Sequence, residues 1–590
     1  MYPFSTFCFR VTLFLTLVYT SSGFAQRLSL PFFDDFSAHT NSSISPAKWI
    51  NAGVCVYPSS TQAPSFYVAT FDGRDIRGIP YVTNFPTAVG QTDSLTSRPI
   101  DLSGVSLKDS LVLSFFYQAK GTGEAPDQED SLILEVRTNQ AEWKTIWHSP
   151  ENKPLDFTLV LLPLVDETLF HEDFQFRFRS FGRQTGPFDT WSVDYIYLDT
   201  QRDVQRGFFP DIAISSIQTS LLKGFQAMPF KTFMANPTRF LADSLAFSVR
   251  NLREFQSSFR YQFTVSDSSQ STIFKQIQVP TPVNVDGDGI TSFKLALAGT
   301  RLPSSPQTVQ YELELATPET FDTTSVASPL FRQNDRIVLQ NDLTNYYAYD
   351  DGTAEGGADT DKQFGSVAIQ FVGLPQDTLA AIRVAFSPTF TDLIGSTIVL
   401  QVHRANKGVP GELLTSQAVR LTEPFQKNEF LEFDLMESIV VNDTFFVGWQ
   451  RIAPTAVPIG LDKNTKPYTS VIYQNTGGEW TRSNLDGFLL IRPVMGNKTL
   501  VNKPSDELIT GLEPDSIFHV FPNPTSDLLY FDLPQKEFES LSLADISGRL
   551  IFSTKDVHSP ISLENIPNGT YFLKIKTQSN TFTKKIILSR

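Results

Sequence analysis

The sequence is poor in cysteine, and this scarcity limits both its stabilisation and its chemistry. It holds two cysteines in 590 residues, Cys8 and Cys55. Cys8 precedes an apolar N-terminal run that we interpret below as a cleaved segment, so the mature chain keeps Cys55 alone and forms no internal disulfide. Flanked by Val54 and Val56, Cys55 has the setting of a small core residue rather than of a nucleophile. Stability must therefore come from core packing, with or without a bound metal ion.

Familiar catalytic and zinc-binding signatures are also missing. The six histidines form no His-x-His or His-Glu-x-x-His pair, which excludes the common zinc spacings. The sequence has no nucleophile elbow, phosphate-binding loop or dinucleotide-binding fingerprint. A catalytic pair of carboxylates stays open, because a glycosidase needs only two acids about 5–10 Å apart in space. We predict that the protein is not an enzyme, with a hydrolase as the alternative.

Basic stripes and long apolar runs are scarce too. The formal net charge is −15, which argues against nucleic acid or an anionic membrane as a partner. The apolar N-terminal run follows Arg10 and is too short for a stable membrane anchor. Gly23 and Ala25 then supply small residues suited to cleavage before Gln26. We predict a signal peptide over residues 1–25, the alternative being a buried N-terminal strand, and no transmembrane segment in the mature chain.

Aromatic and turn-forming residues are plentiful. The chain has 51 Phe and 37 Pro, whereas charged residues make up only 19%. This composition, without stretches rich in Ala, Glu, Lys and Leu, predicts strands joined by turns. Phe174, Phe176 and Phe178 alternate with polar residues, which is the pattern of a half-buried strand. The length predicts about four domains, and we expect an all-β, multidomain series of jelly-roll and immunoglobulin-like β-sandwiches.

Residues 28–200 form the first predicted domain. They open on FFDDF at residues 32–36 and close on WSVDYIYL at residues 191–198. With softer motifs between them, these runs resemble the concanavalin-like jelly rolls of the MAM and choice-of-anchor type in bacterial surface proteins. That resemblance implies a structural calcium ion between the opening and closing strands, held by Asp34, Asp35 and Asp194. The alternative is that these are solvated acids at strand ends.

Two further β-domains and a linker follow. Residues 208–341 have the strand spacing of an immunoglobulin-like sandwich. Residues 345–496 favour a second jelly-roll-like sandwich, and its opening YAYDDGTAE resembles a module of exported Bacteroidota-type proteins. Residues 497–517 are polar and are predicted to form a linker.

Two more groups of acids lie in these domains. The run DGDG at residues 286–289 resembles half of a calcium loop, but it lacks the downstream Glu and favours a plain β-turn. The YAYDDGTAE segment opens a third acidic loop, which we interpret as solvated. Its acids are Asp350, Asp351, Glu355, Asp359 and Asp361.

Residues 518–590 carry the most specific pattern in the chain. The blocks VFPNPT, DISGRL and IPNGTYFLKI occur in this order before the final TKKIILSR. Pro-Asn-Pro favours an extended entry into a strand, and Ser-Gly and Asn-Gly favour turns. The blocks resemble, in order, the type A sorting domain of type IX secretion substrates. The residues that carry the resemblance are Pro522, Asn523, Pro524, Gly548, Gly569, Tyr571 and Lys585.

The resemblance to sorting domains implies a route and a location. In that family the chain enters the periplasm and then crosses the outer membrane, handled by the type IX secretion machinery. The domain is usually cut off, and many substrates become anchored to lipopolysaccharide. We therefore expect a secreted or outer-membrane cell-surface protein that arrives via the periplasm.

For the exported protein we expect a non-catalytic binding or adhesion role toward a glycan or another surface component. A secreted hydrolase and a structural accessory of the secretion or gliding apparatus are the alternatives. A binding protein should expose an aromatic patch or a concave acidic site. The tryptophans are more typical of core packing than of such a patch; they include Trp143, Trp147, Trp191, Trp449 and Trp480.

Repeated Asp-Ser-Leu runs are a last pattern. They match an O-glycosylation motif of these bacteria, which would make the chain a glycoprotein, or they mark ordinary turn exits before strands. The runs begin at Asp93, Asp109, Asp130 and Asp243.

Overall fold

The computed structural model describes most of the chain from Arg27 onward. The described ranges are 27–38, 44–58, 62–151, 153–205, 207–217, 220–267, 273–299, 303–318, 329–422, 424–466, 470–496, 520–521, 525, 527–531, 538–545, 549–555, 560–577 and 581–589. The predicted signal peptide and linker lie outside the described residues. Within the described residues, strands dominate and form eight separate sheets, which confirms the all-β multidomain fold.

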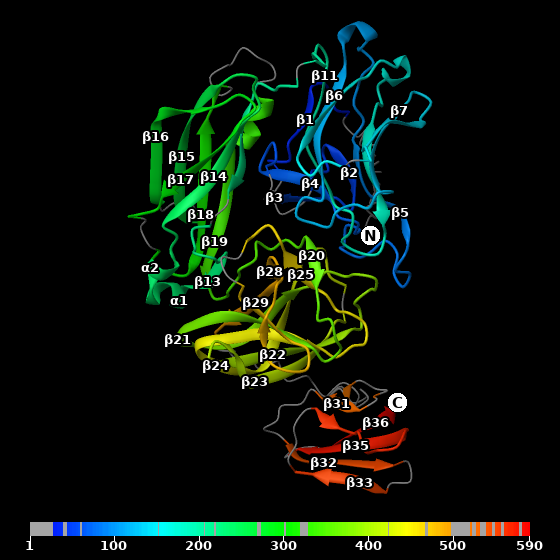
Figure 1. Cartoon of the computed structure of the whole chain (residues 1–590), viewed down its shortest axis with the longest axis vertical. Helices are drawn as coiled ribbons and strands as arrows, with labels where there is room; N and C mark the ends of the chain where they lie inside the picture. Colours follow the sequence, from blue (N-terminus) through cyan, green and yellow to red (C-terminus); the bar gives the residue numbers. More distant parts are fainter. Residues whose placement is uncertain are drawn as a thin grey trace, which may run out of the picture.

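The first domain is a sandwich of two antiparallel sheets (Figure 1). One sheet contains β3 (Cys55–Pro58), β4 (Tyr67–Phe71), β11 (Trp191–Asp199), β6 (Val112–Ala119) and β9 (Thr158–Pro163), with β1 (Phe32–Asp34) on β11. The other contains β2 (Trp49–Ala52), β5 (Val89–Ser97), β10 (Phe176–Arg183), β7 (Ser131–Arg137) and β8 (Trp143–His148), and short 3-10 turns lie at η1 (Leu107–Asp109) and η2 (Glu167–Leu169). Phe174, Phe176 and Phe178 are fully buried while Arg177 and Arg179 are partly exposed, so the predicted alternation is confirmed within β10; Gln175, just before the strand, is buried as well.

The second domain pairs a three-stranded sheet with a five-stranded sheet. The smaller sheet contains β12 (Ile212–Ile217), β14 (Ser244–Asn251) and β17 (Ile290–Ala296). The larger contains β13 (Ala227–Pro229), β19 (Arg336–Thr344), β18 (Gln307–Ala316), β15 (Ser257–Asp267) and β16 (Ile273–Val285), and the helical turns are α1 (Phe230–Ala235), α2 (Pro237–Phe240) and η3 (Leu330–Asp335). Phe247, Phe263 and Leu313 from the two sheets meet in the core.

The third domain is built around two long antiparallel strands, β21 (Ser366–Ala385) and β24 (Phe430–Arg451). Beside them lie β23 (Val409–Arg420), β22 (Thr397–Asn406), β26 (Ile472–Asn475), β27 (Thr481–Arg482) and β29 (Ile491–Met495). A smaller sheet contains β20 (Gly356–Ala358), β25 (Ile459–Asp462) and β28 (Phe488–Leu489).

The fourth domain is a small sandwich, red in Figure 1. Its sheets contain β30 (Val520–Phe521), β31 (Leu528–Phe531) and β34 (Ile561–Ser562), and β33 (Leu550–Thr554), β32 (Phe538–Asp545), β35 (Gly569–Thr577) and β36 (Thr581–Leu588). Along β35, Tyr571, Leu573 and Ile575 are buried and Lys574 and Lys576 are exposed, as the alternation predicted.

The first three domains pack on one another, whereas the fourth lies at the far end of the third (Figure 1). Phe33 of the first domain and Phe331 of the second lie edge to face at 4.9 Å. Phe225 of the second domain stacks on Tyr349 of the third at 4.4 Å. The fourth domain contacts the third through Tyr530. Among the described residues, no helix is both long and apolar enough to cross a membrane.

Candidate functional site

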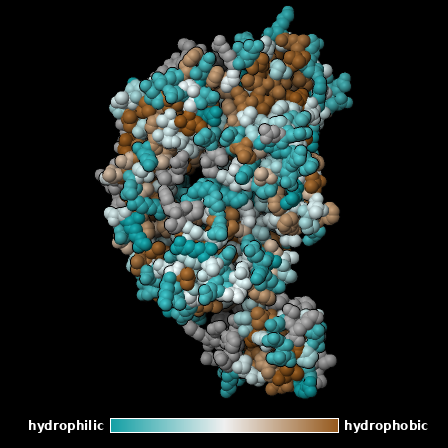
Figure 2. All heavy atoms as spheres, in the orientation of Figure 1, coloured by the Kyte–Doolittle hydropathy of each residue, from teal (hydrophilic) through white to brown (hydrophobic). Residues whose placement is uncertain are grey.

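The three packed domains enclose a central cleft of about 1580 Å³. Figure 2 shows the molecule hollowed at the place where the three domains meet. The cleft is lined by charged groups of both signs, amides and aromatic rings. Examples are Tyr67 from the first domain, Lys223, Tyr311, Arg336 and Gln340 from the second, and Asp351, Asn464, Lys466 and Arg492 from the third.

The YAYDDGTAE segment supplies the acidic wall of this cleft. Asp351 lines the cleft, and its backbone N–H donates to Asp462 Oδ2 on β25 at 2.8 Å. Asp350 and Glu355 are almost fully buried, so the interpretation of these two acids as solvated is wrong. Burial raises the pKa of Asp351 to about 6, and burial together with the charge of Asp351 raises the pKa of Glu355 to about 7. Two carboxyls that titrate near neutrality therefore lie side by side.

The hydroxyl of Thr353 links these two acids. Its Oγ1 lies 2.6 Å from Asp351 Oδ1 and 3.0 Å from Glu355 Oε1. One hydroxyl has one proton to donate, so both contacts are hydrogen bonds only when a carboxyl supplies a second proton. Burial raises the pKa of both carboxyls, so one of the two can hold this proton. A proton-holding carboxyl has the chemistry of a general acid.

A small cavity adjoins this acidic wall, between the first and third domains. Its volume is about 20 Å³, and it is lined by Glu355, Thr122 and Thr190 among others. Within the described residues, the buried Thr190 Oγ1 has no hydrogen-bond partner. A polar cavity of this size holds one water molecule, which would satisfy that hydroxyl.

A buried ion network fixes the first domain to the third. The guanidinium of Arg74, only 1% exposed, lies 2.6 Å from Asp72 Oδ2. Across the interface, Arg74 donates to Ser387 Oγ at 2.9 Å. Lys427 Nζ of the third domain reaches back to Asp72 Oδ1 at 2.8 Å. Asp72 is thus the shared counter-ion of two buried cations, an arrangement that the sequence does not reveal.

The predicted calcium ligands lie together only in part. Asp34 Oδ2 accepts a hydrogen bond from Trp49 Nε1 at 2.7 Å, and Lys48 Nζ lies 3.5 Å from its Oδ1. Burial raises the pKa of Asp194 well above its ordinary value, and the charge of the nearby Asp35 raises it further. Asp34 is therefore already neutralised, whereas Asp35 and Asp194 are two buried carboxyls that repel each other.

The surroundings of Asp35 contain buried oxygen atoms of the kind that bind calcium, which supports the calcium prediction at this residue. Within the described residues, Asp35 Oδ2 and Asn334 Oδ1 are buried and have no hydrogen-bond partner. Asn334 comes from the second domain and lies close enough to act on the pKa of Asp35, which burial raises to about 6. Oxygen acceptors of this kind are the ligands that Ca²⁺ prefers. Asp35, Asp194 and Asn334 would hold the ion, and the calcium site stays a prediction.

Chelation tests this site. If calcium binds at Asp35, its removal should lower the thermal midpoint, because binding at 100 times the Kd stabilises a fold by about 2.7 kcal/mol. We expect the midpoint of the wild-type chain to fall by several degrees with EDTA and to recover with CaCl₂. Asp35→Asn should lose this response, whereas Asp286→Asn, in an exposed turn, should keep it. An unchanged wild-type midpoint would remove the site.

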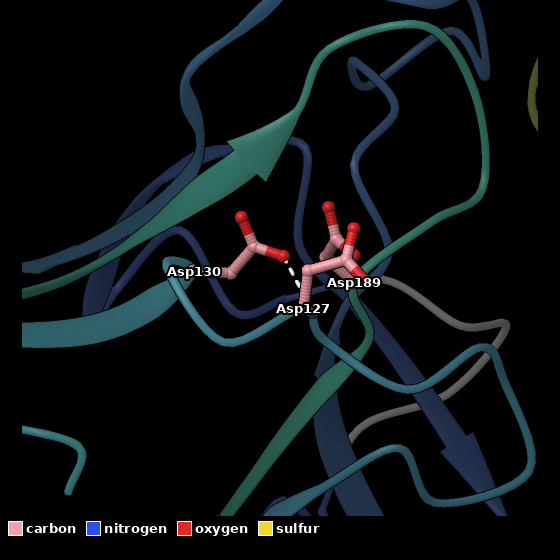
Figure 3. A group of neighbouring side chains, drawn as sticks. All are labelled: Asp127, Asp130 and Asp189. Atoms are coloured by element: carbon pink, nitrogen blue, oxygen red, sulfur yellow. Dashed lines mark hydrogen bonds between the residues drawn. The ribbon is translucent and has the colours of Figure 1, made fainter. Parts of the chain in front are cut away.

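A second acidic cluster lies on the first domain, and no local pattern in the sequence groups its members. Carboxylate oxygens of Asp127, Asp130 and Asp189 lie within 4.8 Å of one another (Figure 3). The N–H of Asp127 donates to Asp130 Oδ2 at 2.6 Å, and the N–H of Arg183 donates to Asp189 Oδ2 at 2.6 Å. Burial raises the pKa of Asp189 to about 7. The spacing of these oxygens suits a hard cation.

The DGDG run, the tryptophans and the Asp-Ser-Leu runs have different surroundings in the structure. The DGDG run forms a turn closed by the Gly289 N–H to Asp286 O hydrogen bond, so the plain β-turn is confirmed. Trp191 and Trp449 are fully buried, which confirms their core role, whereas Trp143, Trp147 and Trp480 are only half-buried. Among the Asp-Ser-Leu runs, Asp93 is fully buried, whereas Ser110 lies on an exposed turn. Glycosylation stays a prediction.

Three of the predicted sorting residues can be placed. Gly569 begins β35, Tyr571 donates its hydroxyl proton to Pro567 O at 2.7 Å, and Lys585 is exposed on β36. Pro522, Asn523, Pro524 and Gly548 lie outside the described residues.

Comparison with known proteins identifies the fourth domain. Residues 519–589 match the family described as the secretion system C-terminal sorting domain. The chain therefore carries a type IX sorting domain, which marks it for export and for release or cell-surface attachment. The likeness of residues 28–200 to MAM-type jelly rolls stays a prediction. No curated protein sequence matches the chain.

Solved structures show only distant similarity. A calcium-binding mutant of Bacteroides uniformis β-glucuronidase 2 is 11% identical over 47% of this chain and 29% of its own, with a TM-score of 0.20. The CBM22 tandem of Paenibacillus barcinonensis Xyn10C is 9% identical over 54% and 97%, with a TM-score of 0.20. A β-galacturonidase from Eisenbergiella tayi is 12% identical over 54% and 44%, with a TM-score of 0.22. The chain spans only 24% of an α-L-arabinofuranosidase and 29% of the β-glucuronidase, and TM-scores this low assign it no activity.

Proposed function

We propose that this chain is a non-catalytic binding protein delivered by type IX secretion, with the central cleft as its ligand site. Its ligand is a glycan or another polymer of a cell surface, and its role is adhesion at the outer membrane. The cleft carries this proposal, because its 1580 Å³ exceed the roughly 300–1,000 Å³ of a small-molecule pocket. An extended polymer fits such a space better than a single small metabolite does.

The lining of the cleft supports a hydroxyl-rich ligand. Arg336 and Lys466 place donors on opposite domains, and Asp351 adds an acceptor. Tyr67 and Tyr311 add aromatic surface between these polar groups. Sugars present hydroxyls at the ring edge and apolar C–H groups on the ring face, so mixed polar and aromatic walls suit them.

One observation favours a hydrolase as the second candidate. Asp351 and Glu355 share the Thr353 hydroxyl, and their pKa values are raised to about 6 and about 7. An ionised carboxylate beside a protonated one is the pairing that glycoside hydrolysis uses. Glu355 is almost fully buried, however, so it reaches a substrate in the cleft only through movement of its surroundings.

Binding and turnover assays separate the two candidates. The wild-type chain should bind members of an immobilised glycan panel and leave chromogenic glycosides intact. Arg336→Ala, which removes a donor from the cleft, should weaken binding about tenfold, as the loss of one charged hydrogen bond does. Arg404→Ala is the control, because Arg404 forms a similarly exposed ion pair outside the cleft lining.

Other outcomes point elsewhere. No glycan binding together with glycoside turnover that Glu355→Gln abolishes would establish the hydrolase. A secretion or gliding defect on gene deletion, with neither binding nor turnover, would establish a structural accessory.

A further inference from the structure

Exposed aromatic rings gather at the outer seam between the first and third domains. Phe85 is 61% exposed and Phe390 is 36% exposed. Phe188 is half-buried, and its ring lies 5.7 Å from that of Phe390. We call Phe85, Phe188 and Phe390 the seam platform. None of the three lines the central cleft, so the platform is a separate surface.

The backbone holds this platform in place. Asn84, next to Phe85, donates its N–H to Phe390 O at 2.8 Å, and the N–H of Phe390 donates to Thr185 O at 2.6 Å. Phe390 has a φ of +64°, a left-handed conformation that is a genuine outlier for a bulky residue. Such a conformation persists only where the surroundings fix it. A rigid backbone that joins two domains therefore presents the rings. Ligand binding does not have to order this backbone first.

Polar groups border the platform. The Arg183 guanidinium lies over the Phe188 ring at 4.7 Å, and its Nη2 is 3.8 Å from Asp127 Oδ2. The side chain of Asp127 is 67% exposed, so its carboxylate can accept hydrogen bonds from a ligand. The guanidinium covers one face of Phe188, so the seam offers the exposed rings of Phe85 and Phe390 near an accessible donor and an accessible acceptor. This is the complement of a sugar ring, which has an apolar C–H face and hydroxyls at its rim.

We propose that the seam platform is a second glycan-binding site, which stacks on a pyranose ring while Arg183 and Asp127 bind its hydroxyls. The proposal rests on the proposed glycan-binding function but not on the cleft. With one subsite in the cleft and one on the outer seam, a single chain engages a polysaccharide at two points, which raises the apparent affinity without new contacts.

Affinity electrophoresis of the mature full-length protein tests the platform. The probes are soluble xylan, mannan and polygalacturonate. The double variant F85A/F390A should bind the retarding polysaccharide about tenfold more weakly than wild type does, because two stacking rings are lost. Phe255→Ala is the matched control, since Phe255 is 72% exposed on the second domain, away from the seam. Unchanged thermal midpoints show that each variant folds.

The outcomes distinguish the platform from the cleft. Retardation lost in F85A/F390A and retained in Phe255→Ala supports the platform. Retardation that F85A/F390A keeps and Arg336→Ala loses overturns the platform and leaves the cleft intact. No retardation of the wild type by any of the three polysaccharides overturns the platform, and a blank glycan panel then overturns the cleft as well. If sedimentation shows a dimer that F85A/F390A abolishes, the occupant is a second copy of the chain, and the glycan proposal is wrong.

Discussion

Asp72→Asn is expected to destabilise the protein by about 3–5 kcal/mol, the cost of leaving buried charge without its partner. Asp72 is the counter-ion of both Arg74 and Lys427, whose side chains are 1% and 4% exposed. Burial alone would raise the pKa of Asp72, but the charges of Arg74 and Lys427 hold it below its ordinary value. The neutral amide keeps the shape of the aspartate and removes its charge, so two buried cations then face each other.

The chain contains a matched control for this variant. Asp75 and Arg77 form an ion pair with the same spacing in sequence and nearly the same distance, 2.7 Å against 2.6 Å. The Arg77 side chain is 58% exposed, so Asp75→Asn should cost only about 0–1 kcal/mol. Urea unfolding of both variants measures the difference. Equal, small losses would show that the network does not hold the first and third domains together.

The difference in unfolding free energy between Asp72→Asn and wild type depends on pH through the pKa of Asp72 and of the acid next to it. A carboxyl whose folded pKa is depressed contributes stability above its unfolded pKa, and this contribution is lost as pH falls through the folded value. Asp72 is therefore ionised in the wild type throughout the neutral range. The neighbouring Asp93 does titrate in this range, because burial and then the charge of Asp72 raise its pKa to about 7. Without the charge of Asp72 the pKa of Asp93 falls, so the stability gap between Asp72→Asn and wild type should be smaller at pH 8 than at pH 6.

Local patterns in the sequence predict what a residue does within its own strand. The alternation around Phe176 and along β35 from Tyr571 to Ile575 is confirmed, because side chains of a strand point to opposite faces in turn. The turn at Asp286 was predictable for the same reason, since it depends on neighbouring residues alone. Such patterns predict the β-sandwich class and indicate which residues of each strand enter the core.

Contacts between domains could not be predicted in this way. Asp72 and Lys427 are 2.8 Å apart in space but belong to different domains, and nothing near either residue in the sequence marks the other. The burial of Asp350 and Glu355 was missed for a related reason, because their partners Arg492 and Asn464 belong to the same domain but lie more than 100 residues away in the sequence. Asn334, which approaches Asp35 from the second domain, was missed for this reason too.

Removal of residues 518–590 is expected to abolish export. These residues include the matched sorting domain, which marks the chain for export. Among the described residues, its apolar contact with the upstream body consists of Tyr530 and Leu528 against Val399, Ile452 and Ala418, so the truncated chain should keep its folded domains. The loss of export should therefore be nearly complete and should occur without unfolding.

Point variants test whether export requires the sorting domain to be folded as well as present. Leu573 is fully buried in the core of this domain, so Leu573→Asp should collapse it and block export as the deletion does. Glu564 is an exposed turn residue, and Glu564→Ala should be exported normally. Thermal melts of the retained protein show whether the upstream domains remain folded.

The most direct test of the account is the location of the chain that lacks residues 518–590. Cell fractionation and protease treatment of intact cells should find the wild-type protein at the surface or in the medium. The truncated protein should be confined to the periplasm, folded and inaccessible to the protease. Surface or medium levels of the truncated protein equal to those of wild type would contradict the assignment of this domain as the export signal.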